Sequence, residues 1–587
     1  MVLYFIIIKY YKVTTAMNRF YLVLHVLLLT GSAFAQDSDL KEPNRTQARS
    51  MVVTKFGIVA TNQTLASAAG IKILEQGGNA VDAAIAANAV MGLVEPNADG
   101  IGGDLFAIIY EAKTGKLYGL NASGWAPTGL TPDLLHSKHL DAVPHTGIYS
   151  VTVPGAVSGW DMMRKRFGTM SFDSILAPAI YYAQNGFPVT ELISHDWSDE
   201  YNKLMTEADS RKLYLPGGKV PSVGQMFYNP ELALTYHEIA LHGRDGFYKG
   251  RVAASILAKS SSLGGTMTGD DLSSFEGDWV TPISTTYRGW KVSELPPNSQ
   301  GIAALEMLNI MERFPMEEYG HNTTKSLHIE IEAKKHAYAD LLKYVGDPKF
   351  SKIPVEQLIS KELGEQHSKE IDLEHAACHI VPADLQAIAK LPVSGTTYLT
   401  TIDKDGNIVS LIQSVFQGFG SNVVVPGAGF VLQNRGALFT LEPGQPNTLA
   451  PRKRPIHTII PAFMEKDDVK IGFGIMNGWN QAQAHAQFVA NIVDYHMNIQ
   501  DAMEAARFVK VTFDGCDLFM ESRIPADVRE ELTSMGHKIK TVAPYSQEMG
   551  GGQAVMVNGQ GVKFGASDAR KDGAAIPQSP AFAIGVP

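Results

Sequence analysis

SGTTYLTTID, residues 394–403, begins the last third of this chain, and IVSLIQSV, residues 408–415, follows it after a polar turn. Both segments are rich in β-branched residues, and the turn contains Asp405-Gly406-Asn407. This pattern predicts two antiparallel strands, Thr396–Ile402 and Ile408–Val415, joined as a hairpin. Taken alone, the threonines indicate only a strand, because threonine suits a pleated surface.

Helices are expected on both sides of this hairpin in the sequence. Apolar residues at helical spacing predict two buried helices within Leu65–Val94 and then a strand over Leu105–Tyr110. Further helices are predicted over Ser326–Tyr344, Ala482–Val493 and Ile499–Phe508. Strands flanked by helices predict a layered α/β or α+β fold, of which α+β is the expected class. Without a repeat or a low-complexity linker, one compact unit is expected.

The composition excludes several classes of protein. The chain has 587 residues, of which 45% are hydrophobic and 19% charged, so it is neither disordered nor fibrous. Its net charge of −10 argues against nucleic acid as a partner, because phosphate binding needs a basic footprint. Two cysteines exclude a disulfide scaffold. Cys378 and Cys516 either pair in an oxidising compartment or remain two separate buried thiols.

The N-terminus has the pattern of a secretory signal peptide, residues 1–35. An apolar run over Phe20–Thr30 follows Arg19 and leads to Ala33-Phe34-Ala35, which matches an A-x-A cleavage site. The run is shorter than the roughly 20 residues of a membrane span, so a membrane anchor is disfavoured. Met17 is an alternative start. These features predict export to the periplasm or the medium, without stable membrane insertion after the signal is removed.

Several catalytic motifs are missing from the sequence. There is no G-x-S-x-G nucleophile elbow and no Walker loop. Gly100-Ile101-Gly102-Gly103 precedes a strand rather than a helix, so tight backbone packing is favoured over a dinucleotide site. The helix over Ser326–Tyr344 carries histidines and glutamates, His328, Glu330, Glu332 and His336, but no HExxH. No metal and no cofactor are therefore predicted.

The chain resembles the γ-glutamyltransferase family, also known as γ-glutamyltranspeptidase or glutathione hydrolase. The resemblance includes the Thr396 segment and covers nearly the whole chain after the leader. Its other blocks are Glu95-Pro96-Asn97 with Gly100–Gly103, Val153-Pro154-Gly155 with Phe167–Met170, Pro296–Gly301, Glu332–Asp340 with Gly346-Asp347-Pro348, Arg454-Pro455, Gly550–Ala554 and Ser567–Ala574. Each block is weak alone, whereas their shared order is specific.

This resemblance implies an N-terminal-nucleophile (Ntn) hydrolase, whose fold is a four-layer αββα sandwich. It also implies an inactive precursor that cuts itself between Gly395 and Thr396. A heavy chain, residues 36–395, and a light chain, residues 396–587, would then form a heterodimer. The expected substrate is a small-molecule amide.

The implied cleavage would make Thr396 an effective nucleophile. A hydroxyl near pH 7 needs a base, and the free α-amine of a terminal threonine, with a reference pKa of about 8, can take its proton. The resemblance places the backbone donors of the oxyanion hole at Asn477 and Gly478, where the family has two glycines. Because asparagine tolerates positive φ better than most residues, this departure permits an oxyanion hole.

Two substrate-binding positions implied by the resemblance have lost their charge. The family arginine that binds the α-carboxylate of a γ-glutamyl group is replaced by Ser123. The family aspartate that holds the α-amine is replaced by Leu438, while a neighbouring glutamine has become Arg435. A buried ammonium without a partner costs several kcal/mol, so a γ-glutamyl group fits poorly in its usual pose. Arg435 either anchors a substrate carboxylate or pairs with an acidic neighbour.

Further positions around the nucleophile are partly kept. The second hydroxyl of the family site is Ser414, but the asparagine that follows it is Phe416. A Ser-Ser pair that helps to bind the carboxylate reads His457-Thr458, and His457 is either a substrate contact or a structural hydrogen bonder. These changes resemble the amidohydrolase and cephalosporin-acylase branch of the family.

Three hypotheses for function follow. The first is a glutathione hydrolase or γ-glutamyl transferase acting on γ-glutamyl or related carboxyl-bearing amides. The second is an amidohydrolase or acylase for amides whose acyl group carries a carboxylate but no α-amine. The third is a binding homologue with impaired catalysis, which the unusual Asn477 motivates.

Overall fold

Two seven-stranded sheets form the centre of the structure and stack face to face. The computed structural model describes residues 48–382, 395–510 and 512–581, so the expected signal peptide lies outside the described residues. The first sheet has the order β1 (Val52–Thr54), β20 (Lys563–Ser567), β19 (Gly552–Val557), β15 (Val469–Ile475), β14 (Ala462–Lys466), β9 (Trp290–Glu294) and β8 (Ile283–Tyr287). The second has the order β21 (Ala574–Pro577), β2 (Ile58–Thr61), β10 (Thr397–Ile402), β11 (Ile408–Ser414), β3 (Asp104–Glu111), β4 (Lys116–Ala122) and β7 (Asp278–Val280).

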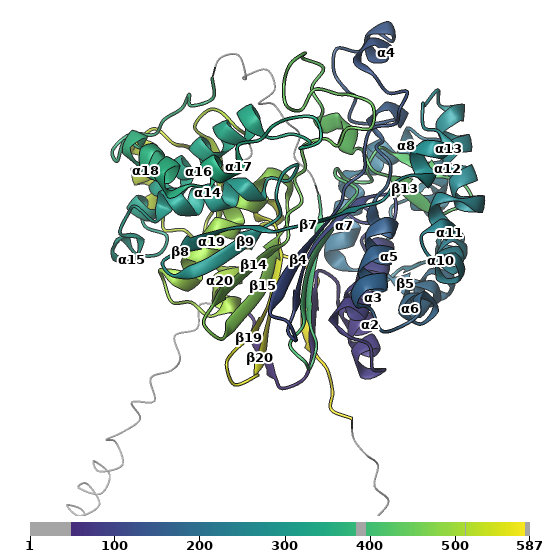
Figure 1. Cartoon of the computed structure of the whole chain (residues 1–587), viewed down its shortest axis with the longest axis horizontal. Helices are drawn as coiled ribbons and strands as arrows, with labels where there is room; N and C mark the ends of the chain where they lie inside the picture. The colour runs from purple at the N-terminus through teal and green to yellow at the C-terminus, as the bar shows by residue number, and fades with distance from the viewer. Residues whose placement is uncertain (1–47, 383–394, 511, 582–587) are drawn as a thin grey trace, which may run out of the picture. The chain divides into compact units, whose positions relative to one another are not determined.

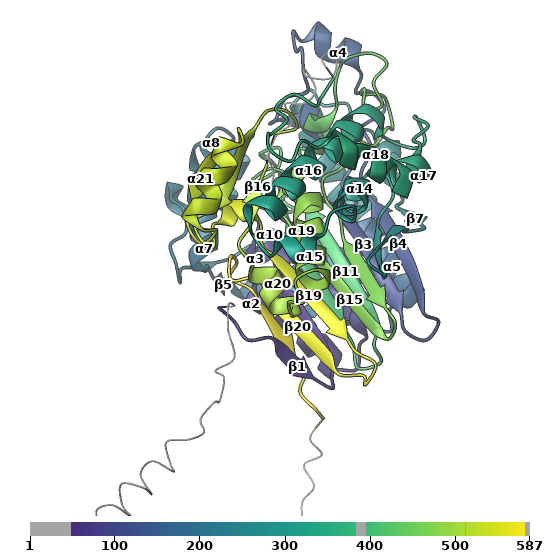
Figure 2. The same cartoon turned by 90° about the vertical axis from the view of Figure 1, so that its left-hand side faces the viewer.

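Helices cover the outer face of each sheet (Figure 1). The second sheet is covered by α2 (Thr64–Glu75), α3 (Ala80–Val94) and α5 (Ala156–Phe167), backed by α6 (Phe172–Asn185) and α10 (Pro230–His242). The first sheet is covered by α14 (Gly301–Met311), α19 (Gln481–Val493) and α20 (Ile499–Glu504), with α16 (Thr324–Tyr344) packed on α14. Figure 2 shows α16, α19 and α20 in front of β15, β19 and β20. The layers are therefore αββα, as the family resemblance implies.

The predicted hairpin is confirmed as β10 and β11, with Ile402 opposite Ile408 at the turn. Side chains alternate along β10 with the period of a strand. Tyr398 and Ile402 belong to the core between the two sheets. Leu399 instead packs in the core beneath the helices, and the Thr401 hydroxyl donates to the carbonyl of a residue in α3. Both faces of β10 are buried, which explains its nearly continuous apolar and hydroxyl-bearing sequence.

Other predicted elements agree with the structure, with one correction. The helices predicted within Leu65–Val94 are α2 and α3. The predicted helix over Ile499–Phe508 is wrong at its end, because α20 stops at Glu504 and Phe508 begins the strand β16 (Phe508–Val509), which pairs with β17 (Asp517–Glu521). Phe508 packs in a separate hydrophobic cluster with that strand, and this tertiary contact overrides the helical pattern.

The glycines after α3 show the tight packing predicted for them. A Cβ on Gly102 would lie 2.0 Å from the carbonyl oxygen of Val431, and a Cβ on Gly103 would lie 2.3 Å from that of Ser414. No side chain fits at either position. The glycines therefore let the chain leading into β3 pass directly against the end of β11, where the candidate site lies.

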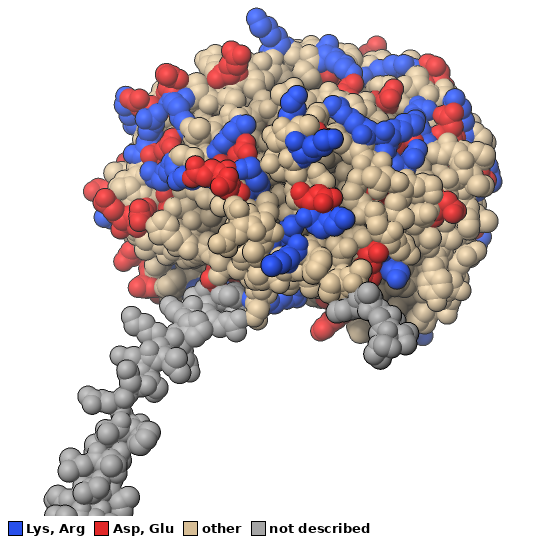
Figure 3. All heavy atoms as spheres, turned by 60° about the horizontal axis from the view of Figure 1, so that its bottom comes forward, with Lys and Arg blue, Asp and Glu red and all other residues tan. Residues whose placement is uncertain are grey.

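The remaining elements surround these layers. The other helices are α4 (Pro132–Ser137), α7 (Glu191–Asp199), α8 (Tyr201–Met205), α9 (Ala208–Tyr214), α11 (Asp245–Tyr248), α12 (Gly250–Ser262), α13 (Gly269–Ser273), α15 (Met316–Tyr319), α17 (Val355–Leu358), α18 (Lys361–Glu370) and α21 (Ala526–Ser534). The other strands are β5 (Phe187–Pro188), β6 (Met226–Phe227), β12 (Val423–Val425), β13 (Phe430–Leu432) and β18 (Lys538–Val542). Among the described residues, no helix is long and apolar enough to cross a membrane. On the face shown in Figure 3, basic and acidic side chains are interspersed.

The two cysteines are joined. Cys378 and Cys516 form a disulfide with an S–S distance of 1.98 Å and a Cα–Cα distance of 4.8 Å. Cys378 lies in the segment after α18, and Cys516 lies immediately before β17. Of the two alternatives that the sequence left open, the structure therefore has the pair.

Candidate active site

Thr396 lies immediately before β10, and Ser414 ends the neighbouring strand β11. In this uncut chain, Thr396 Oγ1 lies 2.5 Å from the carbonyl oxygen of Gly395 and 3.3 Å from Ser414 Oγ. Ser414 Oγ donates to the same Gly395 carbonyl oxygen at 3.0 Å. Thr396 is only 1% exposed. The structure thus brings a hydroxyl, the preceding peptide carbonyl and a second hydroxyl together in a buried position.

Asn477 and Gly478 form a turn between β15 and α19. Both adopt left-handed backbone angles, with φ of 98° at Asn477 and 54° at Gly478. Such angles favour glycine and are tolerated by asparagine, whose side chain here donates to the Glu548 carbonyl at 2.7 Å. Among the described residues, neither backbone N–H has a hydrogen-bond acceptor. Two adjacent backbone donors are therefore free in the turn where the oxyanion hole was predicted.

A buried hydrogen-bond network holds the backbone carbonyls of the Asn477–Gly478 turn and of the next residue. Gln300 Nε2 donates to the Gly478 carbonyl at 2.7 Å. Tyr338 Oη, on α16, lies 2.8 Å from Gln300 Oε1 and 2.5 Å from the Trp479 carbonyl oxygen. Lys334 Nζ donates to that same Trp479 carbonyl at 3.1 Å. The site residues predicted from the sequence do not include these three side chains, although all of them lie within the blocks that carry the family resemblance.

A cavity of about 670 Å³ lies beside Gly395 and Asn477, which both line it. One wall comes from α7 and α8, with the polar side chains His195, Asp196, Asp199, Glu200 and Lys203. Another comes from the segment Ser546–Glu548. The volume suits a small-molecule substrate. No motif in the sequence pointed to these walls, because their residues come from segments far apart in the chain.

Arg435 is fully buried, and its guanidinium is only partly satisfied. Nη1 donates to Thr458 Oγ1 at 2.6 Å, and the Phe416 ring lies 4.3 Å from Cζ. Nε and Nη2 have no hydrogen-bond partner among the described residues, and no described carboxylate oxygen lies within 4.0 Å of the guanidinium. Burial lowers the pKa of Arg435 to about 9, so the group remains charged near pH 7. Two buried guanidinium donors therefore lack an acceptor within the described part of the chain.

Phe416 connects Arg435 to the nucleophile. Its backbone N–H donates to Ser414 Oγ at 2.7 Å, while its ring contacts the Arg435 guanidinium. The residue has a φ of 82°, which is rare for an aromatic side chain. The second hydroxyl of the site and the buried cation therefore lie on opposite sides of one strained residue.

Asp104, at the start of β3, is an acidic centre that the predicted site residues did not include. Its Oδ1 accepts a hydrogen bond from Gln433 Nε2 at 2.7 Å, and its Oδ2 lies 3.1 Å from His457 Nε2. Burial raises the pKa of Asp104 to about 7, although the nearby charge of Arg435 opposes this rise. The residue stands directly after the glycine run, which was the only sequence signal for it.

The two remaining predicted positions, His457 and Ser123, make hydrogen bonds within this uncut chain. His457 Nδ1 accepts from the Ile459 backbone N–H at 3.4 Å, so Nε2 carries the proton that faces Asp104. Burial lowers the pKa of His457 well below its usual range, so the ring is neutral. Ser123 Oγ is buried and donates to Asn121 Oδ1 at 2.7 Å.

Leu438 is shielded from water by its apolar neighbours. Its side chain is buried in the hydrophobic core of the first sheet, with an exposed fraction of 0%. A leucine has no acceptor atom for an ammonium group. The position at which the resemblance places the α-amine binder is therefore apolar in the structure.

Comparison with known proteins decides the family. A sequence model described as gamma-glutamyltranspeptidase matches residues 66–578. The chain belongs to the γ-glutamyltranspeptidase family. It is therefore an enzyme of that family, and its αββα sandwich is the Ntn-hydrolase fold.

Relatives of this γ-glutamyltranspeptidase-family chain include hydrolases and acylases. The glutathione hydrolase-like YwrD proenzyme of Bacillus subtilis is 36% identical over 90% of this chain and 99% of its own length. The acylase ACY 1 proenzyme of a Pseudomonas species, strain SE83, is 31% identical over 89% of this chain and 93% of its own. The crystal structure of cephalosporin acylase from Bacillus halodurans has a TM-score of 0.85 at 39% identity, covering 93% of this chain and all of that one.

Proposed function

We propose that this chain is an exported, self-processing amidohydrolase that uses Thr396 to cleave small amides whose acyl group carries a carboxylate. The observation that carries the proposal is the position of Thr396 Oγ1, 2.5 Å from the carbonyl oxygen of Gly395 in the uncut chain. The family membership supports an amide hydrolase or acyltransferase. The disulfide supports an oxidising compartment, in agreement with the expected signal peptide.

Self-processing begins with the attack of Thr396 Oγ on the Gly395 carbonyl carbon. The Ser414 hydroxyl donates to the oxygen of that carbonyl and stabilises the negative charge that develops there. The C–N bond then breaks, and its nitrogen takes the proton that the Thr396 hydroxyl has lost and becomes the Thr396 α-amine. Gly395 is left as an ester on Oγ. Water hydrolyses this ester, which gives a heavy chain ending at Gly395 and a light chain, residues 396–587, with a free amine.

Turnover repeats the same chemistry on a substrate amide. The α-amine of Thr396 takes the proton from Oγ, and Oγ attacks the substrate carbonyl. The backbone N–H groups of Asn477 and Gly478 stabilise the oxyanion, and the proton passes to the leaving amine. Water then releases the acyl group as an acid and restores the hydroxyl. The network of Gln300, Lys334 and Tyr338 keeps the two donors oriented.

The choice of acyl group rests on Arg435 and Leu438. Two open guanidinium donors favour a carboxylate on the acyl group, and the apolar Leu438 offers nothing to an α-ammonium. We therefore expect glutaryl p-nitroanilide to be hydrolysed with a kcat/KM at least about 10-fold above that of γ-glutamyl p-nitroanilide, because 1.4 kcal/mol of lost stabilisation corresponds to one factor of ten. Steady-state release of nitroaniline measures both.

Each outcome of this comparison separates the hypotheses. Faster turnover of the γ-glutamyl anilide would contradict the acylase assignment and leave a glutathione hydrolase or γ-glutamyl transferase. A processed chain that hydrolyses neither anilide would support the binding homologue. Thr396→Ala, assayed in parallel, gives the background rate of the preparation.

The disulfide predicts a property of the processed enzyme. Cys378 would belong to the heavy chain and Cys516 to the light chain, so cleavage should leave the two chains covalently joined. On a denaturing gel without reductant, after blocking of free thiols, we expect one band of full mass. With reductant, we expect two bands.

A matched variant makes the gel decisive. Cys516→Ser should give two bands under both conditions, whereas the unprocessed Thr396→Ala should give one band under both. Two bands from the wild type without reductant would show that the cysteines do not join the chains. In Cys516→Ser, loss of the Cys378–Cys516 disulfide should also lower the stability of the protein by about 2–5 kcal/mol.

A further inference from the structure

Three helices on the outer side of the first sheet bring together a histidine and two carboxylates. Glu306 lies on α14, Asp340 on α16 and His367 on α18. His367 Nε2 lies 3.1 Å from Asp340 Oδ2 and 3.6 Å from Glu306 Oε1. One ligand atom from each of the three residues lies within 4.8 Å of those of the other two. These residues take no part in the proposed chemistry of Thr396.

Among the residues that the structure describes, the cluster has no positive charge besides the His367 imidazole, whose pKa is raised, against the effect of burial, by its hydrogen bonds to Asp340 and Glu370. Glu306 is 1% exposed, and its Oε1 has no hydrogen-bond partner among the described residues. Within the described part of the chain, His367 is the one basic side chain within 4.0 Å of either carboxylate. Two neighbouring carboxylates in such a buried place need either a shared proton or a cation. The open Glu306 oxygen faces the imidazole and so marks where a cation would bind.

The imidazole is already held in the orientation of a metal ligand. His367 Nδ1 lies 3.2 Å from Glu370 Oε2, which leaves Nε2 for Asp340 and Glu306. Metal-binding histidines usually donate their other ring N–H to a carboxylate in this way. A tetrahedral ion with ligands at about 2.1 Å separates them by roughly 3.4 Å, and the observed 3.1 Å and 3.6 Å lie on either side of this value.

We propose that Glu306, Asp340 and His367 bind one first-row divalent cation, such as Zn²⁺ or Mn²⁺. One imidazole and two carboxylates suit these ions better than Mg²⁺ or Ca²⁺, which prefer oxygen ligands alone. The ion would join three helices that share no disulfide. It would act on stability rather than on bond cleavage, and it does not depend on the proposed function.

The site would also support the candidate active site from behind. α14 begins at Gly301, directly after Gln300, and α16 carries Lys334 and Tyr338. These are the three side chains that hold the turn of the oxyanion hole. A cation joining α14 to α16 would therefore fix the relative position of the two helices from which this network is built. Glu306, Asp340 and His367 themselves are positioning residues.

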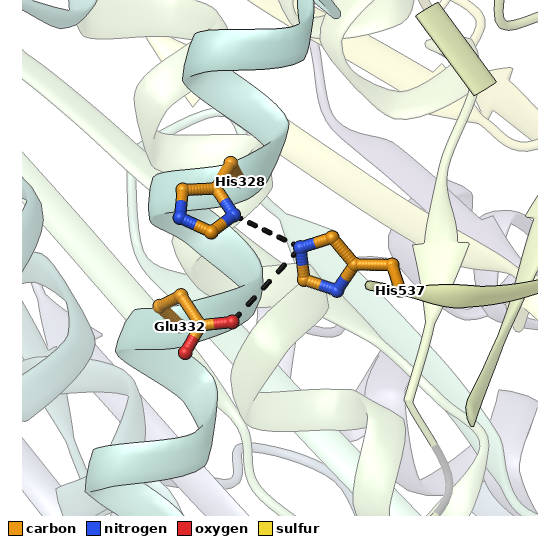
Figure 4. A group of neighbouring side chains, drawn as sticks. All are labelled: His328, Glu332 and His537. Carbon is orange, nitrogen blue, oxygen red and sulfur yellow. Dashed lines mark hydrogen bonds and ion pairs between the residues drawn. The ribbon is translucent and has the colours of Figure 1, made fainter. Parts of the chain in front are cut away.

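A second cluster on α16 serves as the internal control. In Figure 4, His328 and Glu332 project from α16 toward His537. His328 Nε2 lies 2.7 Å from the Asp372 carbonyl oxygen, and His328 Nδ1 lies 2.9 Å from His537 Nε2. The Lys335 ammonium lies 2.6 Å from Glu332 Oε1 and already supplies the positive charge. Because this ammonium already balances the Glu332 carboxylate, we expect no metal there.

Metal content and thermal unfolding of the tag-free full chain test the proposal. The protein is stripped with a chelator, dialysed, and unfolded with and without ZnCl2, MnCl2 or MgCl2. We expect about one Zn²⁺ or Mn²⁺ per chain after gel filtration, a rise of several degrees in Tm with either ion, and a smaller response to Mg²⁺. With CoCl2, a visible absorption band should report nitrogen and oxygen ligation.

Variants decide between a bound ion and a shared proton. Glu306→Gln keeps the size of the side chain and resembles a protonated glutamate, so the variant should fold. It should lose the metal-dependent rise in Tm and the Co²⁺ absorption band. Asp340→Asn should do the same, whereas His537→Gln should respond like the wild type. Absence of any bound metal and of any rise in Tm in the wild type would overturn the proposal. An equal rise in Glu306→Gln would also overturn it, since the ion would then bind elsewhere.

Discussion

Thr396→Ala should yield a single uncut chain with no hydrolase activity, whereas the wild type should yield two chains, the smaller beginning at Thr396. The hydroxyl is the group that lies 2.5 Å from the Gly395 carbonyl oxygen, and alanine removes it without disturbing the strand. Loss of a nucleophile in other hydrolases lowers kcat by more than about 10⁴-fold, and we expect an effect of at least that size. Intact mass and N-terminal sequencing measure the cleavage.

Two neighbouring variants show whether the effect belongs to this hydroxyl. Thr396→Ser keeps a nucleophile and should still be cut, with a lower rate. Thr397→Ala removes the adjacent hydroxyl, which donates to Asp99 rather than to the Gly395 carbonyl, and should still be cut. Cleavage of Thr396→Ala at the same bond would mean that another group performs the attack. If the wild type also stays uncut, the chain has the fold of the family but does not perform the self-cleavage proposed here.

The sequence predicted the hairpin because its signals are local, whereas Thr396 was assigned as the nucleophile through the family resemblance. Thr396–Ile402 and Ile408–Val415 carry turn residues between two β-branched runs, and the structure confirms both strands to within one residue at each end. The left-handed angle at Asn477 agrees with the reasoning from the tolerance of asparagine for positive φ. Such features depend on a few adjacent residues, and the sequence displays them directly.

Features built from distant segments could not be predicted in the same way. Arg435 could be assigned to the site only by the family resemblance. Whether an acidic side chain pairs with Arg435 depends on how β3 packs against the end of β11, which the sequence does not show. The pairing of Cys378 with Cys516 links residues 138 positions apart, and no spacing rule reveals it. The expectation of no metal rested on the missing HExxH motif. The ligands now proposed come from three separate helices, which no single-helix motif can display.

Arg435→Met should remove the preference for a carboxylated acyl group while leaving the fold at least as stable. Charge-assisted hydrogen bonds contribute about 1.5–3 kcal/mol each, so loss of the two open donors should lower kcat/KM for glutaryl p-nitroanilide by roughly 100-fold or more. The loss should appear mainly in KM, because the anchor contacts the substrate equally in the ground state and the transition state. Pentanoyl p-nitroanilide, which lacks the carboxylate, should be hydrolysed at an unchanged rate.

Stability is the readout that separates an anchor from a structural arginine. Burial lowers the pKa of Arg435, so the charged form is less favourable in the folded chain than in water, and its Nε and Nη2 make no compensating hydrogen bond. Methionine in that place buries no charge and can pack against Phe416, so Tm should be unchanged or higher. Arg452→Met, at a partly exposed arginine paired with Asp270, is the matched control and should change neither selectivity nor Tm appreciably. If Arg435→Met unfolded the chain, or kept the glutaryl preference, Arg435 would be part of the scaffold and the carboxylate would bind elsewhere. A residue that costs stability and confers selectivity is what a binding site retains, since selection on packing alone would have removed it.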